Sequence, residues 1–196
     1  MGRVVVVNFI SIDGVIQSPL SADEDREDDF EHGGWVLPYS DDTVNAFMRK
    51  ATVGAAGMLL GRRSYEILYD AWSDADDSDP AVAAMNRMPK YVVSSSPDVL
   101  AWQNSHSIGG RLPLAVTDLK DRAKGDLVVF GAGTLVRGLA EHDLVDEYRL
   151  LLFPVVLGAG KRMFDDRGHL ARFGLADSVV APSGVVILVY TREMSA

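Results

Sequence analysis

The chain has 196 residues, of which 47% are hydrophobic and 24% charged, and its formal net charge is −9 at pH 7. A chain of this length and composition is long enough to bury a sizeable core within a single globular domain. The acidic balance argues against nucleic acid as the main partner, because binding to a phosphate backbone requires a basic face. The sequence contains no cysteine, which excludes disulfides, thiolate metal sites and a cysteine nucleophile.

Membrane and metal binding are not expected either. No apolar run approaches the roughly 20 residues needed to cross a bilayer. The apolar start at residues 4–7 is too short for the core of a signal peptide, and Asn8 interrupts it. The four histidines show no metal-ligand spacing. The sequence therefore predicts a cytoplasmic protein without a metal site.

Short β-branched runs alternate with helical patterns along the chain, which is typical of an α/β fold. The runs predict strands over residues 3–10, 55–60, 91–95, 113–116, 127–130, 147–153, 171–181 and 185–191. The apolar spacing predicts helices around residues 44–51, 65–72, 81–88, 118–123 and 135–141. No helical pattern separates the last strands, so we expect an antiparallel end on an otherwise parallel sheet.

Residues 22–34 are rich in acidic side chains. Like charges repel one another and keep such a run out of a core, which favours a solvated loop. The alternative is a mobile lid beside a pocket, because long loops in compact domains often have that role.

A glycine turn joins the strand expected at 127–130 to the following helix. Gly131, Ala132, Gly133 and Thr134 precede Leu135, which begins the helical pattern. Glycines at a strand end let the backbone approach a phosphate, and the helix behind them presents free N–H groups. The alternative is that they only permit a tight turn. Val136 stands where the third glycine of the usual dinucleotide fingerprint would fall.

Two further strand ends carry residues that suit phosphate. Gly61, Arg62, Arg63 and Ser64 lead from a strand into a helix, and arginine binds phosphate in a bidentate manner. Residues 94–96 are three serines just past another expected strand. Ligands of open α/β sheets collect outside the carboxyl ends of the strands, so the three turns are expected to share one ligand.

Other motifs have two interpretations each. Residues 158–162 fail the P-loop pattern and form either a plain loop or the backbone lining of a ligand pocket. Asp13, beside Gly14, is either a turn residue or a pocket carboxylate. Asp41 and Asp42 are either helix caps or carboxylates that meet a substrate.

Taken in order, these segments resemble the dihydrofolate-reductase-like superfamily, and within it the reductase domain of the bifunctional riboflavin-biosynthesis deaminase-reductase and its stand-alone relatives. The resemblance covers essentially the whole chain. It rests on the segments 11–16, 35–38, 61–66, 94–97, 131–135, 144–148 and 154–164.

The resemblance implies a three-layer α/β/α fold with a central mixed sheet of about eight strands and an antiparallel C-terminal end. It also implies NADPH across the strand ends. Contacts with the cofactor would come from Gly14, Val15 and Ile16 along the nicotinamide, Gly61, Arg62, Arg63 and Ser64 at the adenosine-side phosphates, Ser94 and Ser95 at the 2′-phosphate or adenine, and Gly131, Ala132, Gly133, Thr134 and Leu135 at the pyrophosphate.

On the substrate side, the resemblance assigns contacts to Trp35, Pro38 and Tyr39. Either a carboxylate, Asp13 or Asp41, or an ordered water would supply the proton. It implies a reductase that transfers hydride to a C=N or C=O carbon of a small heterocycle, and 5-amino-6-(5-phosphoribosylamino)uracil reduction is the nearest named activity. A homodimer is also expected. The alternative is a protein of the same fold that binds a nucleotide or flavin-pathway ligand without catalysis.

Overall fold

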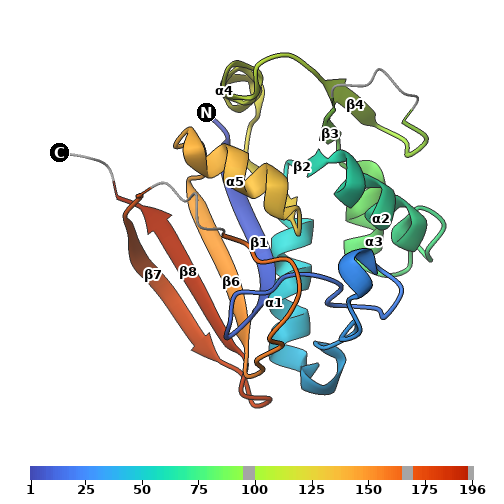
Figure 1. Ribbon diagram of the computed structural model, residues 1–196. Helices are drawn as coiled ribbons and strands as arrows, with labels where there is room; N and C mark the ends of the chain where they lie inside the picture. The colour runs from blue at the N-terminus through green and yellow to red at the C-terminus, as the bar shows by residue number, and fades with distance from the viewer. Residues whose placement is uncertain (95–99, 165–169, 194–196) are drawn as a thin grey trace.

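The computed structural model describes residues 1–94, 100–164 and 170–193, and its framework is one eight-stranded sheet (Figure 1). The strands are β1 (Arg3–Ser11), β2 (Gly57–Gly61), β3 (Lys90–Val93), β4 (Ser105–Ile108), β5 (Asp126–Phe130), β6 (Glu147–Phe153), β7 (Phe173–Val180) and β8 (Val186–Arg192).

The sheet has the order β4-β3-β2-β5-β1-β6-β8-β7. All pairs from β4 to β6 are parallel, whereas β8 runs antiparallel to both β6 and β7. The prediction of a mixed α/β sheet of about eight strands with an antiparallel C-terminal end is therefore confirmed. The arrangement also places the carboxyl ends of β2, β5 and β1 side by side at one edge of the sheet.

Helices cover both faces of the sheet, which gives three layers (Figure 1). They are α1 (Asp42–Val53), α2 (Arg62–Trp72), α3 (Pro80–Arg87), α4 (Leu112–Arg122) and α5 (Gly133–Glu141). Side chains of α1, α2 and α3 pack in one apolar cluster, and those of α4 and α5 pack in another. No helix of the described segments is long and apolar enough to span a bilayer.

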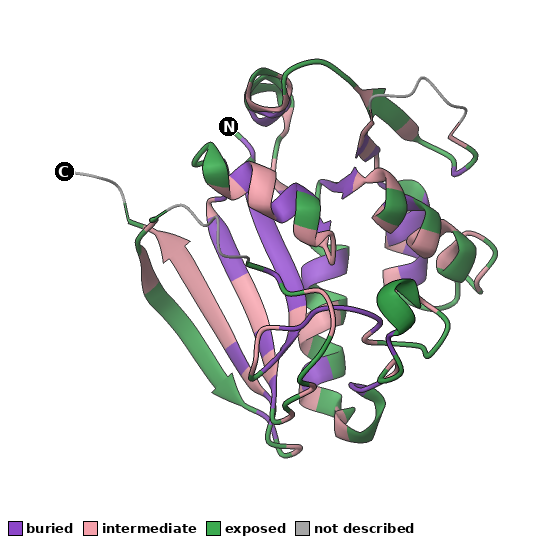
Figure 2. Ribbon diagram, in the orientation of Figure 1, coloured by how far each residue is buried: buried purple, intermediate pink, exposed green. Residues whose placement is uncertain are grey.

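Strand β1 separates the two clusters because alternate side chains of a strand point to opposite faces. Val5 and Val7 belong to the cluster of α1, α2 and α3, whereas Val4 and Val6 belong to the cluster of α4 and α5. All four are buried (Figure 2), which explains why this strand is continuously apolar instead of alternating.

The prediction of a strand over residues 113–116 is wrong, because these residues lie in α4. A short apolar run has no period that separates a strand from a buried helix, and here Pro113 occupies the first turn, where proline favours a helix. The strand that the sequence did not reveal is β4, whose residues are mostly polar and partly exposed at the edge of the sheet.

Candidate functional site

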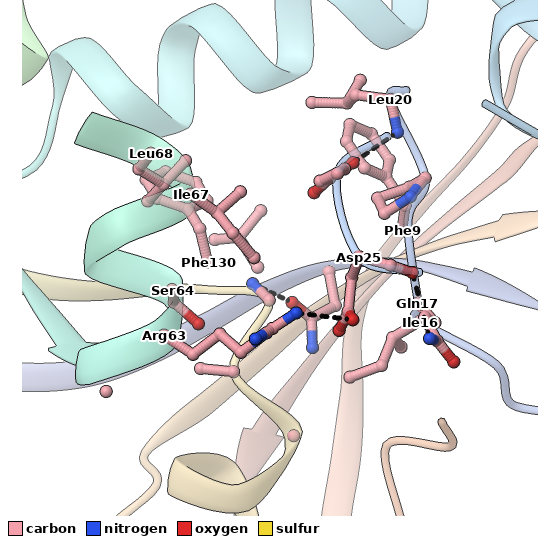
Figure 3. A pocket seen from close by; sticks show the side chains of 18 of the residues that line it. Phe9, Ile16, Gln17, Leu20, Asp25, Arg63, Ser64, Ile67, Leu68 and Phe130 are labelled. Atoms are coloured by element: carbon pink, nitrogen blue, oxygen red, sulfur yellow. Dashed lines mark hydrogen bonds and ion pairs between the residues drawn. The ribbon is translucent and has the colours of Figure 1, made fainter. Parts of the chain in front are cut away.

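A cavity of about 1250 Å³ opens beyond the carboxyl ends of β1, β2 and β5 (Figure 3). Small-molecule pockets commonly measure roughly 300–1,000 Å³, so this cavity is large enough for an extended ligand. Its walls come from the turns that begin α2 and α5, from the segment after β1, from the loop after β6 and from helices α1, α2 and α3.

Ten residues that the sequence assigned to the cofactor line this cavity. They are Ile16, Gly61, Arg62, Arg63, Ser64, Gly131, Ala132, Gly133, Thr134 and Leu135. The parallel order β2-β5-β1 explains why segments distant in the sequence meet here. Among the described residues, the structure therefore brings two of the three predicted strand ends into one cavity.

The turn between β5 and α5 holds its backbone in an unusual conformation. Gly131 and Ala132 both have positive φ values, of 63° and 59°. Ala132 is the N-cap residue of α5, but no side chain caps the helix. A Cβ atom added to Gly133 would lie 3.2 Å from Cδ1 of Ile16, so a larger residue would crowd the cavity wall. The N–H groups of the first helical turn therefore form an anion-binding end that lines the cavity.

The turn between β2 and α2 is similar. Gly61 is the N-cap residue of α2 and again no side chain caps the helix. The arginines that follow both form ion pairs: Arg62 with Glu66 at 2.6 Å, and Arg63 with Asp25 at 2.9 Å. Ser64 also lines the cavity. The cavity thus contains two helix N-termini, and both favour negative charge.

Asp25 connects three separate segments across the cavity, and Figure 3 shows Arg63 extended toward it. Its carboxylate accepts hydrogen bonds from Arg63 at 2.9 Å and from the Lys161 ammonium at 2.7 Å. Lys161 also pairs with Glu27 at 2.6 Å, and the Gln17 amide donates to the carbonyl oxygens of Asp25 and Glu27. Burial alone would raise the pKa of Asp25, but the hydrogen bond from Lys161 and the nearby positive charges lower it.

The acidic segment is therefore not uniformly solvated. Asp23, Asp28 and Asp29 are exposed, as a solvated loop requires, but Glu24 and Asp25 are only partly exposed and line the cavity. The contacts with Arg63 and Lys161 hold Asp25 at the cavity wall, so the solvated-loop interpretation does not describe Glu24 and Asp25. The mobility that the lid interpretation requires stays a prediction.

The other half of the cavity is mainly apolar. Its wall contains Phe9, Leu20, Val44, Met48, Ile67, Leu68, Trp72, Val82, Met85 and Phe130. The carboxyl group of Glu24 lies at this wall, and its Oε2 accepts a hydrogen bond from the Leu20 amide at 2.9 Å. Burial raises the pKa of Glu24, and the neighbouring Asp25 charge raises it further against the opposing effect of the amides.

Asp13 lies outside the cavity lining and has structural partners. Its carboxylate accepts hydrogen bonds from the Ser11 hydroxyl at 2.7 Å and from the amides of Leu157 and Gly158 at 3.1 and 2.9 Å. Arg162 lies 3.4 Å away. Burial alone would raise the pKa of Asp13, but these hydrogen bonds lower it to about 2. The group is therefore an anion that fixes the loop after β6, and the turn interpretation describes it better than a proton donor.

Asp41 also has a structural role. It is the N-cap residue of α1, where its Oδ1 accepts from the Val44 amide at 2.9 Å. Its Oδ2 accepts from the Ser183 amide at 3.0 Å, which connects α1 to the turn between β7 and β8. The hydrogen bonds from Ser183 and Val44 lower the pKa of Asp41. The capping interpretation of Asp41 is confirmed, and this carboxylate does not line the cavity either.

The residues assigned to the substrate do not line the cavity. Trp35 is buried, and its indole N–H donates to the carbonyl oxygen of Gln17 at 2.8 Å. Tyr39 packs edge-on against Phe153, and Pro38 is exposed. Trp35 therefore supports the segment after β1 and acts on the cavity only through that segment.

Among the described residues, the predicted cofactor residues Gly14, Val15 and Ser94 do not line the cavity. Val15 is buried and pairs with Arg162 in an isolated β-bridge, and Gly14 forms the turn before it with a φ of 84°. Ser94 follows β3 without lining the cavity. Ser95 lies outside the described residues.

Several cavity residues were not assigned a role from the sequence. They are Asn8, Gln17, Glu24, Asp25 and Lys161. The loop at residues 158–162 does line the pocket, through Gly160, Lys161 and Arg162, which agrees with the second of its two interpretations. The only local signal for Asn8 is a polar side chain within an otherwise apolar strand.

These features define a dihydrofolate-reductase-like fold with a ligand cavity at the carboxyl ends of its central strands. The chain matches the family model of the RibD C-terminal domain over residues 3–187 and belongs to that family. This family is of a reductase-like type.

Individual proteins are similar to the chain in sequence or in fold. The chain is 29% identical over 140 residues to the uncharacterised protein YyaP of Bacillus subtilis, which covers 68% of this chain and 72% of that protein. Its fold is similar to that of a Shewanella sp. PV-4 protein provisionally assigned to riboflavin biosynthesis, with a TM-score of 0.73, 18% identity and coverage of 98% and 99% of the two chains. It is also similar to dihydrofolate reductase from Enterococcus faecalis in complex with NADP(H), with a TM-score of 0.64, 14% identity and 98% coverage of both chains.

Proposed function

We propose that the protein is an NADPH-dependent reductase that transfers hydride to a C=N or C=O carbon of a small heterocyclic substrate. The observation that carries this proposal is that two uncapped helix N-termini and a mainly apolar chamber share one cavity. A dinucleotide phosphate suits the first part and a flat heterocycle suits the second. Membership of a family related to riboflavin-pathway reductases makes 5-amino-6-(5-phosphoribosylamino)uracil reduction the nearest named activity.

The residues at the cavity fit the cofactor. The first turn of α5 offers N–H groups to a pyrophosphate, and Arg62, Arg63 and Lys161 supply positive charge. When bound, NADPH supplies the hydride. The protein binds and orients the two reactants and excludes water, because the cofactor performs the difficult chemistry.

Glu24 is the group that we propose as the proton donor. Three carboxyl side chains line the described cavity: Glu24, Asp25 and Asp79. Asp25 pairs with Arg63 and Lys161, and Asp79 caps α3 by accepting from the Ala81 amide at 2.7 Å. Glu24 accepts a hydrogen bond from the Leu20 backbone amide, and its raised pKa favours retention of a proton at the carboxyl group.

The test is a titration with NADPH and, in parallel, with NADH, followed by the fluorescence of the dihydronicotinamide. We expect saturable binding that is tighter for NADPH. Gly133→Val should abolish binding, because its side chain would project toward Ile16 at the cavity wall. Gly174→Val on β7 is the matched control, since a Cβ atom there meets nothing closer than 3.6 Å. A wild-type protein that does not bind NADPH at high micromolar concentrations contradicts the proposal.

Turnover separates the two classes of function. A reductase should oxidise NADPH faster in the presence of one member of a panel of pyrimidines, pteridines and related heterocycles, and Glu24→Gln should lower that rate. Saturable binding of NADPH without oxidation by any member of the panel would favour a ligand-binding protein instead.

A further inference from the structure

A single polar residue interrupts the apolar row of β1 that packs against α5. Val4, Val6 and Ile10 belong to the apolar cluster of α4 and α5, and Asn8 holds the position between Val6 and Ile10 on that face. Asn8 is only 2% exposed, yet it also lines the ligand cavity. A buried amide is costly unless its donor and acceptor atoms both have partners.

One half of this amide has a partner. The Oδ1 atom of Asn8 accepts a hydrogen bond from the Gly131 backbone N–H at 2.7 Å. A backbone N–H can only donate, so this contact identifies the oxygen and places Nδ2 on the other side of the amide. Nδ2 is fully buried and has no hydrogen-bond partner among the described residues.

The position of Asn8 explains where Nδ2 can find an acceptor. The last aligned pair of the β1–β5 ladder is Val7 with Phe130, so the two strands separate at Asn8. Gly131 begins the turn to α5 at this point, and both Asn8 and Gly131 line the cavity. The unpaired donor therefore lies at the split between the central strands, where ligands of open α/β sheets bind.

We propose that Nδ2 of Asn8 donates a hydrogen bond to an acceptor oxygen of the bound dinucleotide, while Oδ1 keeps the glycine turn in its binding geometry. This inference rests on the function proposed above. The acceptor is either the carboxamide oxygen of the nicotinamide or an oxygen of the pyrophosphate. Asn8 is thus a binding residue that satisfies its own buried donor only when the ligand is present.

Asn8→Asp tests the donor separately from the structural role. The carboxylate has nearly the same shape and still accepts from Gly131, but it places an acceptor where Nδ2 was. We expect NADPH to bind at least about tenfold more weakly, because an acceptor opposite an acceptor loses the hydrogen bond and adds repulsion. ADP-ribose, which lacks the nicotinamide, identifies the acceptor: equal weakening of both ligands places it on the pyrophosphate, and weakening of NADPH alone places it on the carboxamide.

A second measurement on the wild-type protein does not depend on how well the variant folds. In NMR spectra, the side-chain amide resonances of Asn8 should shift and their hydrogen exchange should slow on saturation with NADPH, together with the backbone amide of Gly131. Unchanged Asn8 resonances with a shifted Gly131 amide would overturn the inference alone, as would equal NADPH affinity of folded Asn8→Asp and wild type. A wild type that shows no response to NADPH at all would overturn the proposed function and this inference with it.

Discussion

Replacement of Asp13 by asparagine tests whether this carboxylate is structural. The side chain is 20% exposed and accepts four hydrogen bonds: one from Ser11, two from amides of the loop after β6 and one from Arg162. Its pKa is lowered from an ordinary 3.8 to about 2, and each unit corresponds to about 1.4 kcal/mol. The ionised form therefore stabilises the fold by about 2 kcal/mol at pH 7, and Asp13→Asn should lower the free energy of unfolding by about that amount.

The pH dependence follows from the sign of the shift. The folded pKa lies below the unfolded one, so the stabilisation is fully present above about pH 4 and is lost as the pH falls toward about 2. Urea denaturation at pH 7 and at pH 3 measures this, and the difference between wild type and Asp13→Asn should fall by roughly half. Asp118→Asn is the matched control, because Asp118 is 67% exposed and pairs only on the surface of α4 with Arg122, where a loss below about 0.5 kcal/mol is expected.

If Asp13→Asn unfolds like Asp118→Asn but no longer oxidises NADPH with a substrate that the wild type reduces, Asp13 acts in catalysis and its hydrogen bonds to the loop are not its main role. Equal stability of all three proteins with unchanged turnover would show that the loop after β6 does not depend on this carboxylate.

Three further predictions concern the ion pairs of Asp25 with Arg63 and Lys161, the buried ammonium of Lys90 and the turn at Ala132. Asp25→Asn should weaken the contacts of Arg63 and Lys161 and increase backbone hydrogen exchange in residues 20–34 by about tenfold. Unchanged exchange would show that these ion pairs do not hold the segment in place. Burial lowers the pKa of Lys90 to about 8, so above that pH the unfolded state binds more protons than the folded state. The free energy of unfolding of the wild type should therefore rise by about 1.5 kcal/mol between pH 8 and 9.5. Urea titrations measure this rise, which should be absent in Lys90→Met. Ala132 has a φ of 59°, so Ala132→Gly should raise the free energy of unfolding by up to about 1 kcal/mol, measured as a higher midpoint of urea denaturation. A lower midpoint would show that the turn is not strained.

Most of the sheet was predictable because its signals are local. Each strand from β1 to β6, except β4, is a short apolar or β-branched run with a turn at its end. Gly61 and Gly131 indicate where a strand ends and a helix follows. The order of the strands was not predicted, because it depends on pairings between distant segments. Strand β4 carried no local signal because edge strands need few apolar residues, and residues 113–116 carried a signal that a helix satisfies equally well.

The contacts of the cavity were less predictable because they join distant segments. Asp25 is 38 residues from Arg63 and 136 residues from Lys161, so no spacing rule connects them. Asn8 and Gly131 are 123 residues apart, and their contact exists only because β1 and β5 are neighbours in the sheet. A sequence pattern indicates which turns can hold phosphate, but not which side chains complete the wall between them.

The carboxylates show why charge pattern alone does not identify a proton donor. Glu24 and Asp25 are neighbours in one acidic run, yet burial raises the pKa of Glu24 whereas Lys161 and Arg63 outweigh burial and lower that of Asp25. The difference comes from partners on other segments, so the sequence presents the two residues as equivalent. Asp13 and Asp41 were better candidates by position in the motif, but each is occupied by backbone amides. A proton donor needs an environment that favours its neutral form, and among these four carboxyl groups only Glu24 has one.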